Sequence, residues 1–391
     1  MKKYNFWKRN TAALLLAVLL CLTGCGTYGQ QADTTEDTPM TTETPVPVKF
    51  NMEKDVLFFG RTYKKGNVWW INWSGAGFSI RFQGSSVAAE FYSNAPDVRN
   101  WAYLKVYVDG VEQPDILLKE ECQLVMLAEG LDPAKAHTVE VRKRTNARSS
   151  SAGVGRLMLM DGKILEPEAP KERLIEFIGD SLTVGYVASK EGKTASAWST
   201  TTEDVTGTYC PQIAQALDAQ YQVVAISGRG IVRNNGGDSN VLFPDIYRET
   251  DIHNNPGVLY DFAVQPQVIV INLGTNDESA ANENLPAEEF KQGLYDFLKE
   301  VRQHNPDAQI LYTYGLVRVK LSGAIEEVVQ KLQNEGDSKL HYLQLEQCQS
   351  WELNLNHTVS SAYTSRGEAI IEKIRQITGW ERRKAMIKPI K

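Results

Sequence analysis

Five short apolar runs alternate with helix-like stretches over the second half of the chain, and this rhythm constrains the fold most strongly. The apolar runs are 174–178, 223–226, 268–273, 310–314 and 342–345, and the helical stretches are 213–219, 290–304, 324–333 and 368–377. Strands that are apolar on consecutive residues suit a parallel sheet that helices cover on both faces. The pattern therefore predicts a doubly wound α/β domain with a five-stranded parallel sheet over residues 169–391. Ligands of such a sheet bind at the carboxyl ends of its strands.

Residues 49–168 follow a different rhythm of short segments in which apolar side chains alternate with polar ones. Examples are Phe78-Ile80-Phe82 and Val87-Ala89-Phe91. Asp109-Gly110 follows a third such segment and is a hairpin signal. Alternation with period two and closely spaced turns predicts an antiparallel β-sandwich, of a jelly-roll-like kind, ahead of the α/β domain.

The first 48 residues have the features of an export signal followed by a tether. Lys2 and Lys3 precede an apolar run at 12–22 that is too short to span a bilayer comfortably. The sequence Leu22-Thr23-Gly24-Cys25 then resembles a bacterial lipobox. This resemblance implies a signal peptide at 1–24, acylation of Cys25, export and lipid anchoring to the bacterial cell membrane or surface. A plain signal peptide with an incidental cysteine is the alternative. Residues 25–48, rich in Thr, Glu and Pro, are expected to form a disordered tether.

Charge and cysteine content exclude several function classes. A net charge of -6 and a pI near 5.6 leave no basic surface for phosphates, so nucleic acid is not an expected partner. If Cys21 leaves with the signal peptide and Cys25 is acylated, Cys122, Cys210 and Cys348 remain. One disulfide with a spare thiol is the alternative, and we expect free thiols that act as small buried apolar groups. The chain has no CxxC or HExxH pattern, so we expect neither a metal nor another cofactor.

Three strand ends of the predicted parallel sheet carry residues suited to acyl transfer. Ser181 follows the first strand in Gly-Asp-Ser, where its hydroxyl is presented at the carboxyl edge of the sheet. Gly228 follows the second strand and Asn276 the third. The backbone amides of Ser181 and Gly228 and the side-chain amide of Asn276 can converge on one oxyanion, where each donor is worth about 3 kcal/mol. Each of these residues alone is also typical of a turn or a helix cap.

The motifs IEFIGDSLTVGY, YQVVAISGRG and YDFAVQPQVIVINLGTND, with VYVDG upstream, resemble the SGNH or GDSL-type hydrolases. Within that superfamily they are most similar to carbohydrate esterase family 2, which joins a β-sandwich to an SGNH domain. The resemblance implies that Ser181 is the nucleophile and that Gly228 and Asn276 are oxyanion donors, while Asp180 braces the loop. It also implies deacetylation of plant-type polysaccharides, of the mannan or xylan class, through an acyl-enzyme and without a metal.

His357 is the expected general base among the five histidines. It follows the last predicted strand and precedes the last helix, where the resemblance places the catalytic histidine, and imidazole suits proton transfer near neutral pH. His137 belongs to the predicted sandwich, while His304 and His341 lie at the ends of predicted elements. His253, in the loop between the second and third strands, is a minor candidate.

The third member of a catalytic triad has no obvious candidate. The family's histidine is typically preceded by Asp two or three residues earlier, but this chain has Asn354 and Leu355 at those positions. We therefore predict a Ser-His dyad in which a backbone carbonyl orients the imidazole of His357. Glu352, five residues upstream, is the alternative partner.

The surroundings of the site leave several interpretations open. Tyr186, Trp198 and Tyr260 can form a wall on which sugars stack, or they can serve packing alone. Arg229 and Arg233 are expected to take part in structural ion pairs.

The leading hypothesis is a serine esterase whose partner is an acetylated polysaccharide or oligosaccharide. The alternatives are a lipid or thioester hydrolase of the same superfamily, and a carbohydrate-binding surface lipoprotein without catalytic activity.

Overall fold

A five-stranded parallel sheet forms the centre of the C-terminal domain in the computed structural model, which describes residues 47–383. Its strands, in spatial order, are β15 (Gln220–Ala225), β14 (Leu174–Gly179), β16 (Val268–Asn272), β17 (Gln309–Tyr314) and β18 (Leu340–Gln344). Gly179, the last residue of β14, lies level with Ala225 and Asn272 on the two neighbouring strands. The predicted sheet is confirmed, and its first three strands end side by side at one edge.

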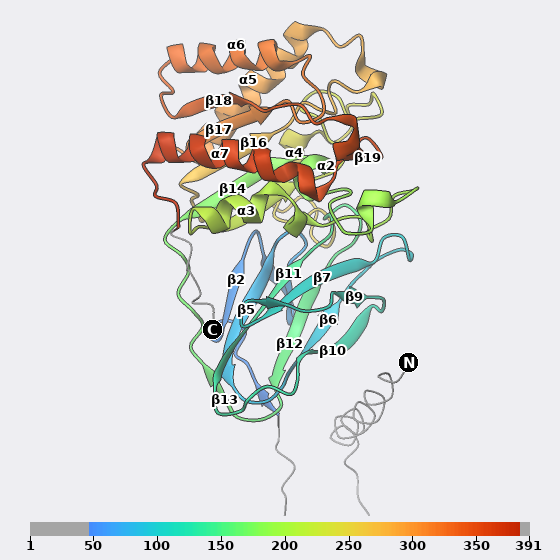
Figure 1. The fold of residues 1–391 in the computed structure, drawn as a ribbon, viewed down its shortest axis with the longest axis vertical. Helices are drawn as coiled ribbons and strands as arrows, with labels where there is room; N and C mark the ends of the chain where they lie inside the picture. Colours follow the sequence, from blue (N-terminus) through green and yellow to red (C-terminus); the bar gives the residue numbers. More distant parts are fainter. Residues whose placement is uncertain (1–46, 384–391) are drawn as a thin grey trace, which may run out of the picture. The chain divides into compact units, whose positions relative to one another are not determined.

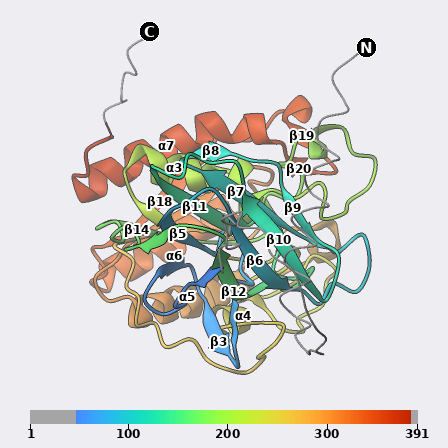
Figure 2. The same ribbon diagram turned by 90° about the horizontal axis from the view of Figure 1, so that it is seen from below.

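Helices cover both faces of this sheet, as expected for strands that are apolar throughout. One face packs against α3 (Tyr209–Ala216) and α7 (Tyr363–Thr378), and the other against α5 (Ala287–His304) and α6 (Ser322–Asn334) (Figures 1 and 2). The shorter helices are α2 (Ser181–Val184), α4 (Phe243–Tyr247), η1 (Gly192–Thr194), η2 (Val205–Gly207), η3 (Ala280–Asn282), η4 (Ser350–Glu352) and η5 (Ser360–Ala362). The doubly wound arrangement leaves the carboxyl edge of the sheet to loops and short helices.

Two antiparallel sheets form the N-terminal domain, which confirms the predicted sandwich. The first contains β10 (Cys122–Ala128), β6 (Val87–Tyr92), β12 (Gly153–Leu159), β4 (Val68–Trp70) and β3 (Tyr63–Lys65), with β1 (Val48–Lys49) on β12. The second contains β13 (Lys163–Leu165), β5 (Gly77–Gln83), β11 (Ala136–Lys143), β7 (Ala102–Val108) and β8 (Val111–Glu112), with β2 (Val56–Phe59) on β5 and β9 (Ile116–Leu118) on β7. Phe78, Ile80 and Phe82 point into the core and are at most 1% exposed. Asp109 and Gly110 both have positive φ and form the predicted hairpin turn.

The sandwich packs directly against the α/β domain through buried polar contacts. Arg61, which is buried, holds its guanidinium 4.2 Å from the ring centre of Tyr260 and 3.5 Å from the carboxylate of Glu176. Asn72 donates to the carboxylate of Asp251 at 2.7 Å. Buried polar groups of this kind are costly to separate because each would lose its partner. Residues of the sandwich are therefore held against the loops of the α/β domain.

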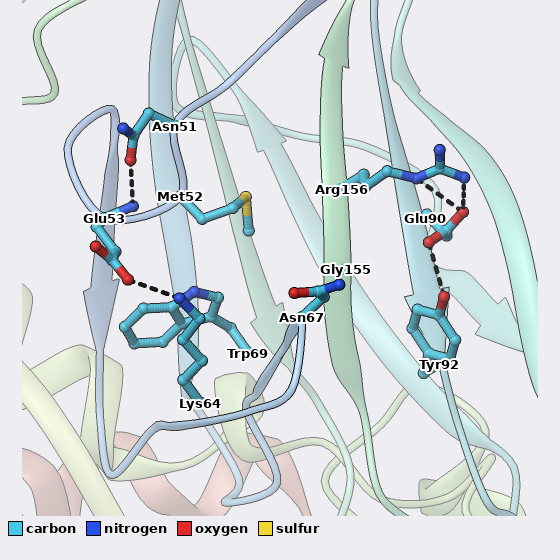
Figure 3. Close-up of a pocket in the computed structure, with 10 residues that line it drawn as sticks. All are labelled: Asn51, Met52, Glu53, Lys64, Asn67, Trp69, Glu90, Tyr92, Gly155 and Arg156. Atoms are coloured by element: carbon cyan, nitrogen blue, oxygen red, sulfur yellow. Dashed lines mark hydrogen bonds and ion pairs between the residues drawn. The ribbon is translucent and has the colours of Figure 1, made fainter.

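The sandwich also carries a hollow of about 670 Å³, shown in Figure 3. It is lined by Asn51, Met52, Glu53, Lys64, Asn67, Trp69, Glu90, Tyr92, Gly155 and Arg156. The charges on its walls are paired with one another, Lys64 with Glu53 at 2.6 Å and Arg156 with Glu90. The hollow therefore offers little unpaired charge to a ligand.

The cysteine prediction is correct in part. Cys122, Cys210 and Cys348 are free thiols, and the last two are buried. Cys122 is exposed instead, because it begins β10, the edge strand of its sheet. The leader, most of the tether and the predicted acylation site Cys25 lie outside the described residues. No helix within residues 47–383 is long and apolar enough to cross a membrane.

Candidate active site

Ser181 and His357 are brought together from positions 176 residues apart in the chain. Ser181 is the first residue of α2, directly after β14, and His357 begins β20 (His357–Thr358), which pairs with β19 (Leu353–Asn354). The Nε2 atom of His357 lies 2.8 Å from the Oγ of Ser181. This is the distance at which an imidazole can take the proton of a serine hydroxyl.

The imidazole of His357 is oriented by a backbone carbonyl. Its Nδ1 lies 2.8 Å from the oxygen of Leu355, within the turn that joins β19 to β20. Leu355 and Asn356 both have positive φ, at 48° and 61°, as a two-residue hairpin turn of this kind requires. The carbonyl accepts the Nδ1 hydrogen, so the unprotonated Nε2 faces Ser181. This is the geometry that the predicted dyad requires.

Glu352 is directed away from His357. Its carboxylate accepts two hydrogen bonds from Arg366, at 2.6 and 2.9 Å, and one from the backbone amide of Gln349 at 2.8 Å. Asn354, at one of the positions where the resemblance leads one to expect an acid, donates its side-chain amide to the carbonyl of Gly192 at 2.7 Å. Glu352 and Asn354 thus form hydrogen bonds with other partners, and neither orients the imidazole of His357.

The protonation of His357 gives the first testable prediction. Burial lowers the pKa of His357 below its ordinary value of 6.5, and the Leu355 carbonyl only partly opposes that shift. The neutral base is therefore present down to lower pH than for an exposed histidine. We expect the acidic limb of kcat/KM for 4-nitrophenyl acetate to have an apparent pKa below 6.5. An acidic limb well above that value would indicate a carboxylate that stabilises the imidazolium, and would contradict this assignment.

The predicted oxyanion donors lie at three adjacent strand ends. Gly228 has a φ of 83°, a conformation that favours glycine. Within the described residues, the backbone amides of Ser181 and Gly228 donate no hydrogen bond to the protein. The side-chain amide of Asn276 donates to the carbonyl of Arg229 at 2.8 Å and to Asp180 at 3.1 Å. Asn276 must therefore exchange one of these bonds to reach an oxyanion, and its role remains a prediction.

Two buried carboxylates hold the loops that carry these donors. Asp180 caps α2 by accepting the amide of Leu182 at 3.0 Å, which is the bracing role that the resemblance implies. Burial raises the pKa of Asp180 to about 7, and the nearby charge of Asp277 adds to this effect. Asp277 accepts three successive backbone amides, from 231 to 233, at 2.8–2.9 Å. The loop after β15 is thereby fixed to the loop after β16.

The sandwich contributes contacts to this site that the sequence did not reveal. Asn146, in the loop between β11 and β12, donates its side-chain amide to the hydroxyl of Ser227 at 2.8 Å. Its backbone amide donates to the buried carboxylate of Glu203 at 2.9 Å. Arg148, two residues later, donates to the carbonyl of Ser227 at 3.3 Å. Asn146 and Arg148 thus hold the residue immediately before Gly228.

Two of the three predicted wall aromatics lie at the site. The ring of Tyr186 stacks on His357 with 4.2 Å between centroids, and Trp198 stacks on Tyr186 at 5.7 Å with an interplanar angle of 12°. The indole of Trp198 donates to Glu203 at 3.1 Å, which fixes the ring. Tyr260 lies elsewhere, over Arg61 in the contact with the sandwich, so packing is the correct interpretation for that residue.

The two predicted structural arginines differ from one another. Arg233 forms an ion pair with Glu289 at 2.5 Å, as predicted. Arg229 instead donates to the carbonyls of Asn240 and Val241 at 2.8 and 2.9 Å, and it pairs with no carboxylate of the described residues. The ion-pair prediction is wrong for Arg229 because its side chain ends among backbone carbonyls of the loop it closes.

Comparison with known proteins gives matches over both domains. The model of the carbohydrate esterase 2 N-terminal domain matches residues 58–168, and that of the GDSL-like lipase/acylhydrolase family matches residues 177–343. An acetylxylan esterase / glucomannan deacetylase of Cellvibrio japonicus is 34% identical over 288 residues, which cover 68% of this chain and 74% of that protein.

A second relative, the cellulase/esterase CelE of Acetivibrio thermocellus, is 31% identical over 283 residues, or 70% of this chain. The matched region spans only 33% of the length of CelE. Among solved structures, a family two carbohydrate esterase from Clostridium thermocellum in complex with cellohexaose superposes with a TM-score of 0.77. It is 28% identical, and the match covers 83% of this chain and 99% of the other. The similarity therefore extends over both the sandwich and the α/β domain.

Proposed function

Because the chain belongs to family 2 of the carbohydrate esterases, we propose that it removes O-acetyl groups from plant-type polysaccharides of the mannan or xylan class. Membership of this family makes it a carboxylic ester hydrolase. The observation that carries the proposal is the hydrogen bond of 2.8 Å between Ser181 and His357, with the Leu355 carbonyl behind the imidazole.

The proposed reaction passes through an acetyl-enzyme. His357 takes the proton of the Ser181 hydroxyl as its oxygen attacks the acetyl carbonyl, and the amides of Ser181 and Gly228 bind the resulting oxyanion. His357 then returns the proton to the departing sugar oxygen. Water, deprotonated by His357, attacks the acetyl-serine and releases acetate, and the proton restores the serine hydroxyl. Each half-reaction needs only one base, which a dyad supplies.

The ordered dyad argues against the alternative of a carbohydrate-binding protein without catalytic activity. A site kept only for binding has no need of a serine and a histidine in hydrogen-bond contact, or of two strained residues in the turn that aims the histidine. The stacked Tyr186 and Trp198 beside His357 support a sugar substrate, since flat rings pack well on pyranose faces. The names of the relatives, which include xylan and glucomannan, point the same way.

A substrate panel tests the proposal against its alternatives. We expect release of acetate from acetylated xylan or acetylated glucomannan and hydrolysis of 4-nitrophenyl acetate. We expect little turnover of long-chain lipid esters or acyl thioesters. Turnover of lipid esters or thioesters without release of polysaccharide acetate would favour the lipid or thioester hydrolase. An intact protein that hydrolyses none of these compounds would favour the binding protein.

We further propose that the chain is exported and anchored to the bacterial membrane through lipid on Cys25, since its leader resembles a lipobox. Replacing the cysteine by serine removes the thiol that would be acylated. We expect the Cys25→Ser variant to lose membrane association in fractionated cells while its esterase activity is unchanged. A Cys25→Ser variant that stays in the membrane fraction as the wild type does would rule out this anchor.

A further inference from the structure

We propose that the site takes acetylated polysaccharides that carry carboxylates, and that Arg99 and Arg148 of the sandwich bind those carboxylates beside the acetyl group. Uronic acid residues are the sugars that supply such carboxylates. The inference rests on the proposed function and specifies its substrate further. If it is correct, the sandwich helps to select the substrate through these two arginines.

Arg148 lies against the loop that carries the predicted oxyanion donor. Its Nη1 donates to the carbonyl of Ser227 at 3.3 Å and lies 3.3 Å from the point that a Cβ on Gly228 would occupy. Asn146 accepts the backbone amide of Arg148 at 3.0 Å, so the loop that presents the side chain is itself held. Arg148 remains exposed to solvent, which leaves most of its guanidinium donors available to a ligand.

Arg99 lies at the aromatic wall, in the loop between β6 and β7. Its Nη2 donates to the carbonyl of Trp198 at 3.1 Å, and its own carbonyl accepts the amide of Thr200 at 2.9 Å. The nearby carboxylate of Asp97 accepts the backbone amide of Arg99 and the side chain of Asn100, and forms no bond with the guanidinium. Arg99 is also exposed. A sugar chain that stacks on Trp198 would pass beside it.

The charges of these arginines are not neutralised by the protein. Many arginines of the described residues have carboxylate partners, for example Arg144 with Asp115 and Arg156 with Glu90. Among residues 47–383, neither Arg99 nor Arg148 has an ion-pair partner of this kind, although the chain as a whole is acidic at -6. The site therefore presents positive charge on a protein of the opposite sign.

The electrostatic influence of both arginines extends to the site. Burial, with the charge of Glu203, raises the pKa of Tyr186, and the charges of Arg148 and Arg99 oppose that rise. Tyr186 is the ring that stacks on His357. Burial lowers the pKa of Arg229, and the positive charge of Arg148 adds to the effect, so a third guanidinium is close by. A carboxylate bound here would relieve this repulsion.

The ligand chemistry follows from the side chains. A guanidinium offers paired donors that fit a carboxylate, whereas neutral sugar hydroxyls gain nothing from its charge. With Trp198, the outer ring of the stack, as the surface for the sugar, a pyranose that carries a carboxylate can contact the ring and a guanidinium together. An anionic polymer would also be attracted from a distance at low ionic strength.

Matched substrates test the inference. Acetylated xylo-oligosaccharides with uronic acid substituents can be separated by anion exchange from those without, and matched for length and acetyl content. We expect the wild type to show a kcat/KM several-fold higher on the anionic pool at low salt, and this preference to shrink at high salt. Equal rates on both pools, with no effect of salt, would overturn the inference and leave the proposed function standing. Failure to release acetate from either pool and from acetylated glucomannan would instead contradict the proposed function.

Variants of Arg99 and Arg148 test whether these two residues cause the preference for the anionic substrates. Arg148→Gln and Arg99→Gln are each expected to lower the anionic-to-neutral ratio of kcat/KM about two- to fivefold, the range expected for exposed charge pairs. Arg148→Lys and Arg99→Lys keep the charge and should retain most of the ratio. Arg81→Gln, on strand β5 of the sandwich, is the control that should leave it unchanged. A ratio that survives in the Arg99→Gln and Arg148→Gln double variant would exclude these two residues.

Discussion

The Ser181→Ala variant is expected to lower kcat for 4-nitrophenyl acetate by about 10⁴-fold or more, because it removes the atom that forms the acyl-enzyme. Its fold should be unaffected. The hydroxyl of Ser181 makes one side-chain hydrogen bond within the described residues, to His357, so alanine at this position leaves packing and caps in place. Initial rates with the wild type and the variant at equal concentration provide the measurement.

The control for this variant is a melting temperature and a far-ultraviolet circular dichroism spectrum that match the wild type. Retention of most of the esterase activity by a folded Ser181→Ala protein would show that another residue is the nucleophile. The same assay on acetylated xylan would show whether the polymer and the small ester are hydrolysed by one site.

The His357→Ala variant is expected to lose nearly all activity, whereas Glu352→Gln should change kcat by no more than roughly tenfold. The first removes the base that contacts Ser181, and triad members of serine hydrolases contribute about 10⁴-fold or more. The second removes a carboxylate that binds Arg366 and not the imidazole. The pKa of Glu352 is lowered chiefly by its hydrogen bond to Arg366, so its charge serves that ion pair.

The melting temperature of Glu352→Gln distinguishes a structural role of Glu352, as the partner of Arg366, from a catalytic role as a triad acid. Glu352→Gln should lower the melting temperature, because the buried guanidinium of Arg366 loses its charged partner. A folded Glu352→Gln protein whose kcat falls about a thousandfold would contradict the dyad and assign Glu352 to the triad.

Much of the fold was predictable because it depends on patterns of short range. Consecutive apolar residues identified the parallel strands, and alternation identified the sandwich, since each pattern follows from which faces of a strand are buried. Ser181, Gly228 and Asn276 could be placed at one edge because parallel strands end on the same side. His357 could be selected as the candidate base from its place between the last strand and the last helix, and the structure places its Nε2 2.8 Å from the Oγ of Ser181.

The parts that could not be predicted depend on an unusual turn conformation in one case and on a contact over a long sequence distance in the other. The carbonyl that orients His357 belongs to Leu355, and its position depends on a turn in which two residues without glycine adopt positive φ. Asn356 is of a type that tolerates positive φ, but Leu355 is not, so the segment does not signal such a turn. The contact of Asn146 with Ser227 joins two domains across 81 positions, and nothing around Asn146 differs from an ordinary polar loop.

Individual side chains were also misjudged where local sequence was the only guide. Cys122 was expected to be buried, but the edge position of β10 exposes it. Arg229 was expected to form an ion pair, but its guanidinium ends among backbone carbonyls. Neither the edge position of β10 nor the loop that closes around Arg229 is evident from the residues directly beside Cys122 or Arg229.

Covalent labelling tests most directly whether Ser181 is a nucleophile activated by His357. Treatment with an organophosphorus fluoridate should attach about one group per protein molecule, on the peptide that contains Ser181, and acetyl esterase activity should fall in step with labelling. The His357→Ala variant should be labelled far more slowly. Full modification of Ser181 with activity retained, or loss of activity through modification of a different residue, would contradict the account.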